Sequence, residues 1–185
     1  EYPKRLLHIY DYPMGLYVKG ELPDEECPTA AIIGARNCSE YGRQAAGFMG
    51  KELARAGIQI VSGLALGIDG AGHEGALNGK GRTYGVLGCG VNICYPRSNY
   101  DLYEAIPFQG GILSEFGPDE EPMARNFPMR NRIISGLSDV ILIMEARKKS
   151  GSLITASLGL EQGKEIFALP GRITDDLSAG CNELI

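Results

Sequence analysis

Short apolar runs and longer helical stretches alternate along most of this chain. Six apolar runs have the length of strands: residues 29–34, 58–63, 82–88, 110–116, 139–146 and 164–171. Five stretches between them have helical character: residues 39–57, 68–79, 98–106, 127–138 and 152–163. Because short links join the two kinds of segment, the pattern predicts an α/β fold with a parallel sheet.

The predicted strands are apolar at consecutive positions rather than at every second position. This pattern is expected when helices cover both faces of a sheet, and it indicates a doubly wound arrangement. Such folds place their functional sites at the carboxyl ends of the strands, beside the amino termini of helices. We expect residues 27–185 to form this core domain and residues 1–26 to be an extension that leads into it.

The composition is that of an ordinary globular protein, with 185 residues of which 44% are hydrophobic and 22% are charged. No apolar run approaches the roughly 20 residues that a membrane span needs, and the first residues lack the apolar stretch of a signal peptide. The five cysteines contain no C-x-x-C pair. We therefore expect reduced thiols in a cytoplasmic protein, and no structural zinc site.

Basic residues are concentrated in one segment of an acidic chain. The formal net charge is −5, which argues against a protein that coats DNA broadly. Residues 125–149 contain two acids, Asp139 and Glu145. The same segment contains six basic residues: Arg125, Arg130, Arg132, Arg147, Lys148 and Lys149. The local field of such a segment attracts an anion whatever the net charge of the whole chain.

Two predicted helix starts have the residues of an anion-binding loop. Arg36 follows the first strand in "GARNCSEYG", where a glycine turn leads to Ser39 at the start of a helix. Another helix opens directly after Lys149, at Ser150, Gly151 and Ser152. The hydroxyl and N–H groups of these residues suit either helix capping or phosphate binding. The fingerprints of dinucleotide-binding and P-loop proteins are absent, so we expect no cofactor.

An aromatic residue stands among arginines in "ARNFPMRNR". Phe127 in this string suits two roles that the sequence leaves open: an exposed ring on which an unpaired base stacks, or a core residue that fixes the start of its helix. Arginine binds phosphate through several N–H donors. The combination favours a single strand over a duplex, because the bases of a single strand are free to stack.

Few residues indicate catalysis. Asp69 and His73 stand four positions apart on one predicted helix face, which suits a metal site or an acid–base pair, but also a helix cap beside a packed histidine. Glu115 lies at the end of a predicted strand, where catalytic carboxylates occur. The chain has no G-x-S-x-G elbow and no evident nucleophile with a neighbouring base, so we expect a binding protein rather than an enzyme.

The chain resembles the core of the DNA-processing protein A family (DprA/Smf). The similarity runs in family order from residue 29 over nearly the whole chain, in the strings "AIIGARNCSEYG", "IVSGLALGIDGAGHEGAL", "GVLGCGVNICYPRSNYDLYEAI", "GGILSEF", "NFPMRNRIISGLSDVILIMEARKKSGSLITA", "GKEIFALPG" and "SAGCNELI". The lead-in "YPKRLLHIYDYPMGLYVKG" is similar too. This resemblance implies a Rossmann-like, three-layer αβα fold with a mostly parallel sheet.

The resemblance also implies a function. Family members bind and protect incoming single-stranded DNA in natural transformation, load the RecA recombinase onto it and displace single-strand binding protein. They are typically homodimers, and the resemblance implies no enzymatic activity. Their basic pocket lies at the strand ends. Arg36, Phe127, Arg130 and the serine–glycine–serine helix start match family positions, and Arg125 and Lys149 are basic neighbours of these positions. The expected DNA-binding residues are therefore Arg36, Arg125, Phe127, Arg130, Lys149, Ser150, Gly151 and Ser152.

One position departs from the family pattern. Many members have a basic residue three positions before the phenylalanine, and this chain has Ala124 there. Arg125 lies one position nearer to Phe127, and we expect it to substitute for the absent basic residue.

A second interpretation is a nucleotide-processing enzyme, similar to the phosphoribohydrolases often called lysine-decarboxylase-like. The same fold, with its glycine loops and Glu115, suits such an enzyme. Its "PGGxGTxxE" loop is absent, and "KSGSLITASLGLEQG" lies in a similar place without the glutamate at that spacing. Release of free base from nucleoside monophosphates would distinguish this enzyme from a DNA-binding protein.

Overall fold

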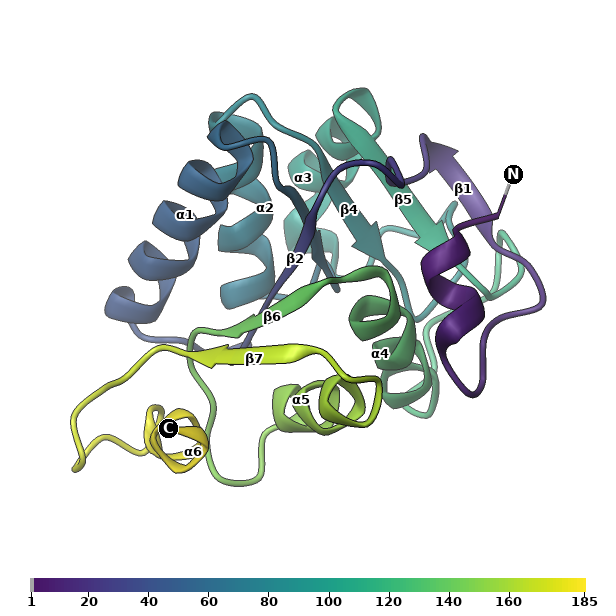
Figure 1. Ribbon diagram of the computed structural model, residues 1–185. Helices are drawn as coiled ribbons and strands as arrows, with labels where there is room; N and C mark the ends of the chain where they lie inside the picture. Colours follow the sequence, from purple (N-terminus) through teal and green to yellow (C-terminus); the bar gives the residue numbers. More distant parts are fainter. Residues whose placement is uncertain (1) are drawn as a thin grey trace.

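A seven-stranded sheet lies between two layers of helices in the computed structural model, which describes residues 2–185 (Figure 1). The strands are β1 (Tyr17–Gly20), β2 (Thr29–Ile33), β3 (Gln59–Ser62), β4 (Thr83–Val86), β5 (Gly110–Ser114), β6 (Val140–Ile143) and β7 (Glu165–Ala168). Their order across the sheet is β1-β5-β4-β3-β2-β6-β7, and all neighbouring pairs are parallel except β1 and β5. This arrangement confirms the predicted α/β fold.

Helices cover both faces of the sheet. They are α1 (Glu40–Arg55), α2 (Ile68–Asn78), α3 (Tyr100–Ala105), α4 (Asn126–Leu137), α5 (Gly151–Glu161) and α6 (Ala179–Leu184), with 3-10 turns η1 (Lys4–His8), η2 (Arg97–Asn99) and η3 (Ile106–Phe108). α1 and α2 lie on one face, and η1, α4 and α5 lie on the other (Figure 1). Within residues 2–185, no helix has the length and apolar character needed to cross a membrane.

Alternate residues of the central strands enter different cores. In β2, Ile33 packs in a cluster with Ile133 of α4, whereas Ile32 packs on the other face in a cluster with Ala46 of α1. All five residues of β2 are buried. Because both sides of the strand are covered, every position has to be apolar or hydrogen-bonded, which explains the continuous apolar run in the sequence.

The order of the strands creates a crevice beside β2. From β2 the chain proceeds outward through β3, β4 and β5, and it then returns to place β6 on the opposite side of β2. The loops that follow β2 and β6 therefore leave the sheet in different directions. Ligands of open α/β sheets bind at this kind of reversal, outside the carboxyl ends of the strands.

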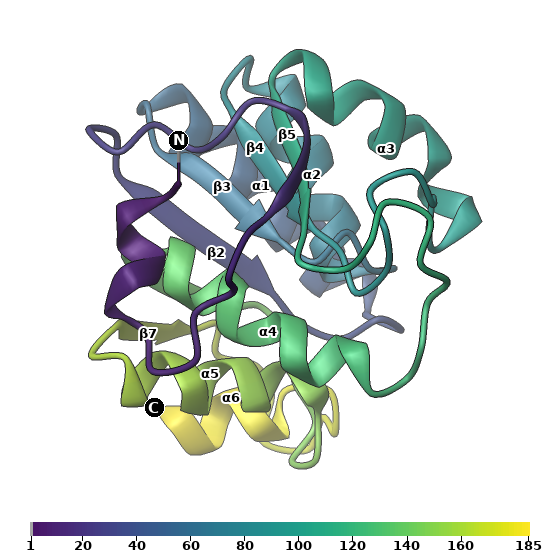
Figure 2. The ribbon, with the colours of Figure 1, turned by 90° about the vertical axis from the view of Figure 1, so that its right-hand side faces the viewer.

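Three elements lie outside the predicted set: β1, α6 and the 3-10 turn η1. β1 is an antiparallel edge strand, in which Tyr17 lies opposite Ser114 of β5, and α6 follows the last predicted strand. The side chains of β1 are mostly exposed, so its sequence contains no apolar run. The segment before β1 runs alongside α4 (Figure 2), and its residues Leu6 and Ile9 are buried in the core on that face. A domain boundary at residue 26 stays a prediction.

Helices α1 and α2 approach each other closely because glycines lie at their contact. A Cβ atom at Gly75 would lie 2.2 Å from the carbonyl oxygen of Gly47, and one at Gly50 would lie 2.3 Å from the carbonyl oxygen of Gly72. Side-chain carbon atoms do not fit at such distances. The glycine-rich sequence of α2 is therefore required for packing against α1.

The substitution Gly75→Ala tests this packing. The added methyl group has to separate the two helices, so we expect the free energy of unfolding in urea to fall by about 1–3 kcal/mol. Gly117→Ala is the matched control, because a Cβ atom at Gly117 meets no atom within 4 Å. Equal stability of the two variants would show that the helices are not in close contact at Gly75.

Candidate nucleic-acid interface

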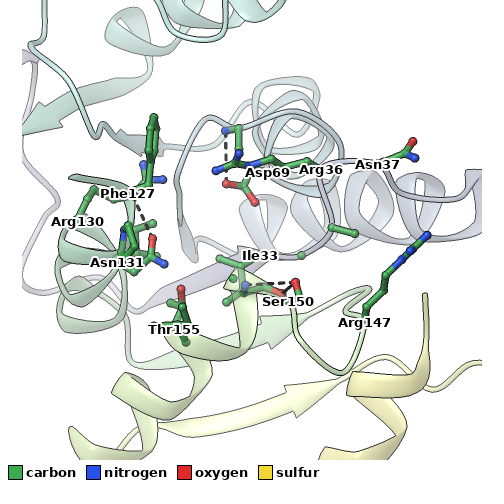
Figure 3. Close-up of a pocket in the computed structure, with 18 of the residues that line it drawn as sticks. Ile33, Arg36, Asn37, Asp69, Phe127, Arg130, Asn131, Arg147, Ser150 and Thr155 are labelled. Carbon is green, nitrogen blue, oxygen red and sulfur yellow. Dashed lines mark hydrogen bonds between the residues drawn. The ribbon is translucent and has the colours of Figure 1, made fainter. Parts of the chain in front are cut away.

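A cleft of about 820 Å³ opens at the carboxyl ends of β2 and β6, where the strand order reverses (Figure 3). Its walls come from the loops after β2, β4 and β6, from α4 with the loop before it, and from the start of α5. All of the expected binding residues except Arg125 line it: Arg36, Phe127, Arg130, Lys149, Ser150, Gly151 and Ser152. The fold thus brings together residues that are more than a hundred positions apart in the sequence.

The loop after β2 places Arg36 in the cleft wall. The carbonyl oxygen of Ala35 accepts a hydrogen bond of 3.2 Å from the N–H of Ile68 at the start of α2. Gly67 has a φ of +74°, and a Cβ atom there would lie 2.4 Å from the carbonyl oxygens of Ala35 and Arg36. Glycine is therefore required at position 67. The hydrogen bond to α2 therefore fixes the backbone of this loop, from which the Arg36 side chain is exposed.

Phe127 is half-buried, so its ring packs against the protein and also lines the cleft, and base stacking on it stays a prediction. Its ring covers Gly88, where an added Cβ atom would lie 2.9 Å from Phe127 Cδ1. The remaining part of the ring lines the cleft. The ring of Tyr95 lies 5.6 Å from that of Phe127, centroid to centroid, and the guanidinium carbon of Arg36 lies 5.5 Å from the Phe127 centroid. The packing fixes the ring while one part stays accessible from the cleft.

Arg130 lies in the floor of the cleft with only 4% of its surface exposed. Its Nη1 donates hydrogen bonds to the carbonyl oxygens of Gly63 and Val86, at the carboxyl ends of β3 and β4. Burial lowers the pKa of Arg130 to about 10, and the negative charge of Asp69 opposes that change. Arg130 therefore holds α4 against two strand ends, and a direct contact with phosphate stays a prediction.

The start of α5 faces the cleft. Ser150 Oγ accepts a hydrogen bond of 3.3 Å from the N–H of Ser152, so the capping role expected for this serine is present. The N–H of Ser150 donates to the carbonyl oxygen of Arg147 at 3.0 Å, which closes the turn before the helix. In the part of the chain that the structure describes, no carboxylate bonds to this helix start. Its partial positive charge is thus directed at the cleft.

The other predicted anion site, at the start of α1, is already filled. The buried carboxylate of Glu145 accepts hydrogen bonds from Ser39, from the N–H at 2.8 Å and also from Oγ. A Cβ atom at Gly42 would lie 2.4 Å from the carboxyl carbon of Glu145, which shows how closely the acid lies against the helix. The expectation of a phosphate cradle at Ser39 is therefore wrong, because a carboxylate that follows β6 occupies this helix start.

Two cations of the basic segment are engaged away from the cleft. Arg132 forms two hydrogen bonds of 2.6 Å with the carboxylate of Glu115. Lys148 forms an ion pair of 2.5 Å with Glu183. None of these four residues is part of the cleft lining. Glu115, which the sequence left as a candidate catalytic carboxylate, is held by an arginine outside the cleft.

Apart from the buried Arg130, the remaining cations of the segment are exposed. Arg147 and Lys149 line the cleft, whereas Arg125 does not. Ala124 does line it, so the wall carries a methyl group where many family members are expected to have a basic side chain. Substitution of Arg125 for that basic residue stays a prediction.

Five polar or aromatic lining residues are not among the candidates from the sequence: Asn37, Tyr95, Asn131, Arg147 and Thr155. Asn37 and Arg147 follow the carboxyl ends of β2 and β6, the strands at the reversal. Tyr95 belongs to the loop after β4 and Asn131 to α4. The rule that sites lie at the carboxyl ends of strands could have indicated Asn37, Tyr95 and Arg147, since each of them follows a predicted strand.

Asp69 and His73 do not form a catalytic pair or a metal site. Asp69 accepts hydrogen bonds from the N–H groups of Gly63 and Ala65, at 3.1 and 3.4 Å, and burial raises its pKa. His73 is fully buried, with Nδ1 2.7 Å from Thr83 Oγ1. The packed histidine of the second alternative is therefore confirmed, but the capping aspartate is wrong, because the start of α2 has no side-chain cap and Asp69 holds the loop before that helix. Within residues 2–185, no group of three or more metal-ligating side chains occurs.

A family model described as DNA recombination-mediator protein A matches residues 1–185. The chain belongs to this family. The match confirms the resemblance to the DprA/Smf proteins. The cleft of this chain brings together basic side chains, an aromatic ring and a helix start.

Two curated relatives of the DprA/Smf family match over the whole chain. DNA processing protein DprA of Streptococcus pneumoniae is 44% identical over 184 residues, which are 100% of this chain and 65% of that protein. Protein Smf of Escherichia coli is 48% identical over 185 residues, which are 100% of this chain and 50% of that protein. The chain thus spans between half and two thirds of the length of these relatives.

A solved structure of DNA processing protein A from Helicobacter pylori matches with a TM-score of 0.90 and 36% identity, over 100% of this chain and 84% of that one. Its description states that this protein binds single-stranded DNA. The high TM-score confirms a Rossmann-like, three-layer fold for the DprA/Smf core.

The buried His73 predicts acid sensitivity. Burial lowers its pKa to about 3 from the ordinary 6.5, and the charge of Arg130 contributes to the decrease. The unfolded chain therefore binds a proton below pH 6.5 that the folded chain does not bind. We expect the free energy of unfolding to fall as the pH decreases from 6.5 toward 3, by at most about 1.4 kcal/mol per pH unit from this group.

Urea unfolding of His73→Gln between pH 7 and pH 4.5 measures this contribution. Glutamine does not titrate, so stability should depend less steeply on pH than in the wild type. His8→Gln, at an exposed position, is the control and should keep the wild-type slope. The same slope in all three proteins would show that His73 does not cause acid sensitivity.

Proposed function

We propose that this chain binds single-stranded DNA in the cleft, independently of base sequence. The observation that carries the proposal is the ring of Phe127, which lines the cleft 5.6 Å from the ring of Tyr95 and 5.5 Å from the guanidinium of Arg36. An aromatic ring beside a cation provides a stacking surface for a base next to a contact for its phosphate. Such contacts carry little information about base identity.

The expected residues have different roles in this proposal. Arg36 and Lys149 contact phosphates as exposed cations, and Ser150, Gly151 and Ser152 offer a helix start to a phosphate oxygen. Arg130 supports the floor of the cleft. Arg125 contacts the strand only where the DNA extends beyond the cleft, since its side chain does not line the cavity.

Two comparisons support the proposal. The Helicobacter pylori relative, whose description names single-stranded DNA binding, has the same fold over the full length of this chain. The family model is described as a recombination mediator. Neither assigns the individual residues of this cleft, and the experiments below address those.

The DNA-bound protein is further proposed to act in natural transformation and recombination. It protects the incoming strand, displaces single-strand binding protein and loads the RecA recombinase, and it forms a homodimer. These partners follow from the family alone. Recombinase assembly on coated single strands tests the loading step, and light-scattering mass tests the dimer. A monomer that leaves assembly unchanged would contradict both proposals.

Arg36→Ala is expected to weaken binding of labelled oligo-dT roughly tenfold, because one charge-assisted phosphate contact is lost. The loss should be similar for other base sequences. The plot of log affinity against log salt should become shallower by about 0.7, the value for one phosphate contact with a single strand. Fluorescence anisotropy at several salt concentrations gives both quantities.

Lys80→Asn is the matched control for Arg36→Ala. It removes one positive charge at the opposite edge of the sheet, between α2 and β4, and asparagine tolerates the φ of +59° at this position. Affinity and salt slope should stay those of the wild type. If both substitutions had the same effect, the net charge of the protein rather than the cleft would control binding.

Phe127→Leu is expected to weaken binding roughly 5- to 100-fold without changing the salt slope. Leucine fills part of the space over Gly88 but provides no aromatic face for a base. Phe127→Tyr retains the ring and should bind nearly as the wild type does. Phe108→Leu, at an exposed position before β5, is the control. Unchanged binding by Phe127→Leu would refute base stacking at this site.

A further inference from the structure

The exposed charge of the cleft is confined to one wall. Among the described residues that line it, four are basic, and three of these are exposed: Arg36, Arg147 and Lys149. All three follow the carboxyl ends of β2 and β6. Asp69, the acid in the lining, is buried and bonded to backbone N–H groups. This wall therefore presents a positive field to the cleft.

The facing wall carries no exposed charge among its described residues, because Arg130 of α4 is buried in the floor of the cleft. It consists of Pro122, Ala124 and Phe127 on α4 and the loop before it, together with Tyr95. Figure 3 shows Phe127 on one side of the cleft, and Arg147 extending from the β6–α5 loop on the other side. One wall thus suits a phosphate backbone and the other suits bases.

The backbone of Arg147 is fixed at two points. The carbonyl oxygen of Ala146 accepts a hydrogen bond of 2.7 Å from the N–H of Gly180, and that of Arg147 accepts one of 3.0 Å from the N–H of Ser150. The second bond joins Arg147 directly to the cap residue of α5. A guanidinium and a helix start are consequently held next to each other, which suits binding of the same phosphate group.

The three consecutive basic residues 147–149 do not all face the cleft. Lys148 is paired with Glu183 at 2.5 Å and does not line the cleft. Arg147 and Lys149, on either side of it, do line the cleft, and neither forms an ion pair within residues 2–185. The two cations directed at the cleft are therefore available to an external anion.

We propose that Arg147 is a phosphate-binding residue of the cleft. Its position sets the path of the DNA, whose backbone follows the wall of Arg36, Arg147 and the α5 start while the bases face Tyr95 and Phe127. The basic residue that is absent at Ala124 is thus replaced from the opposite wall. This inference rests on the proposed binding of single-stranded DNA and adds a residue and a path to it.

Arg147→Ala tests the assignment with labelled oligo-dT in fluorescence anisotropy. Affinity should fall about tenfold, and the salt slope should become shallower by about 0.7. Arg147→Lys should keep the slope but recover only part of the affinity, because an ammonium lacks the paired donors of a guanidinium. Lys148→Ala is the matched control and should bind as the wild type does. Equal thermal unfolding of the variants excludes misfolding as the cause.

The double variant Arg147→Ala with Ala124→Lys tests the path. It restores the number of charges in the cleft but puts the new one on the wall assigned to the bases, so affinity should stay well below that of the wild type. Complete recovery would show that only the charge of the cleft matters, and it would overturn the assigned path.

Arg36→Ala separates the failure of this inference from the failure of the proposed function. Weaker binding by Arg36→Ala together with wild-type binding by Arg147→Ala would overturn the role of Arg147 alone. If the wild-type chain showed no preference for a single strand over a duplex of equal length, the proposed function and this inference would both be refuted.

Discussion

The buried guanidinium of Arg130 is the interaction on which the cleft depends. It bonds to the strand ends at Gly63 and Val86, and it lies 5.9 Å from the ring of Phe127. A cation in the interior is unfavourable unless hydrogen bonds and an opposite charge compensate it, and the carbonyl groups and Asp69 provide this compensation. Because two strands, α4 and the aromatic ring meet at one group, the walls are fixed relative to each other before a ligand binds.

The arrangement of the sheet and the place of the site follow from local features of the sequence. Continuous apolar runs indicate the six parallel strands, since burial on both faces requires them. Arg36 and Ser150 follow two of these runs, so the general rule for α/β sheets already places them at one edge. β1 could not be predicted in this way, because it is an antiparallel edge strand whose mostly exposed side chains form no apolar run.

The use of each charged residue cannot be read from local sequence. Arg130, Arg132 and Arg147 belong to one basic segment, yet one is buried, one is paired with Glu115 and one is exposed. The partners that decide this are distant in the chain: Arg130 bonds to carbonyl groups 67 and 44 residues away. Glu145 lies 106 residues from Ser39. Such pairings depend on which helix lies beside which strand end, and this is settled only when the sheet is assembled.

Helices α1 and α5 both start at the carboxyl edge of the sheet, but the N–H groups at their starts have different partners. A carboxylate of the protein itself, Glu145, permanently satisfies α1, whereas α5 has a serine cap and an open approach. The contact between the segment after β6 and the start of α1 is therefore complete without a ligand. In the proposed complex, a strand of DNA would bind at α5 by displacing water and salt ions, so its binding and release would not break the interactions that keep the domain folded.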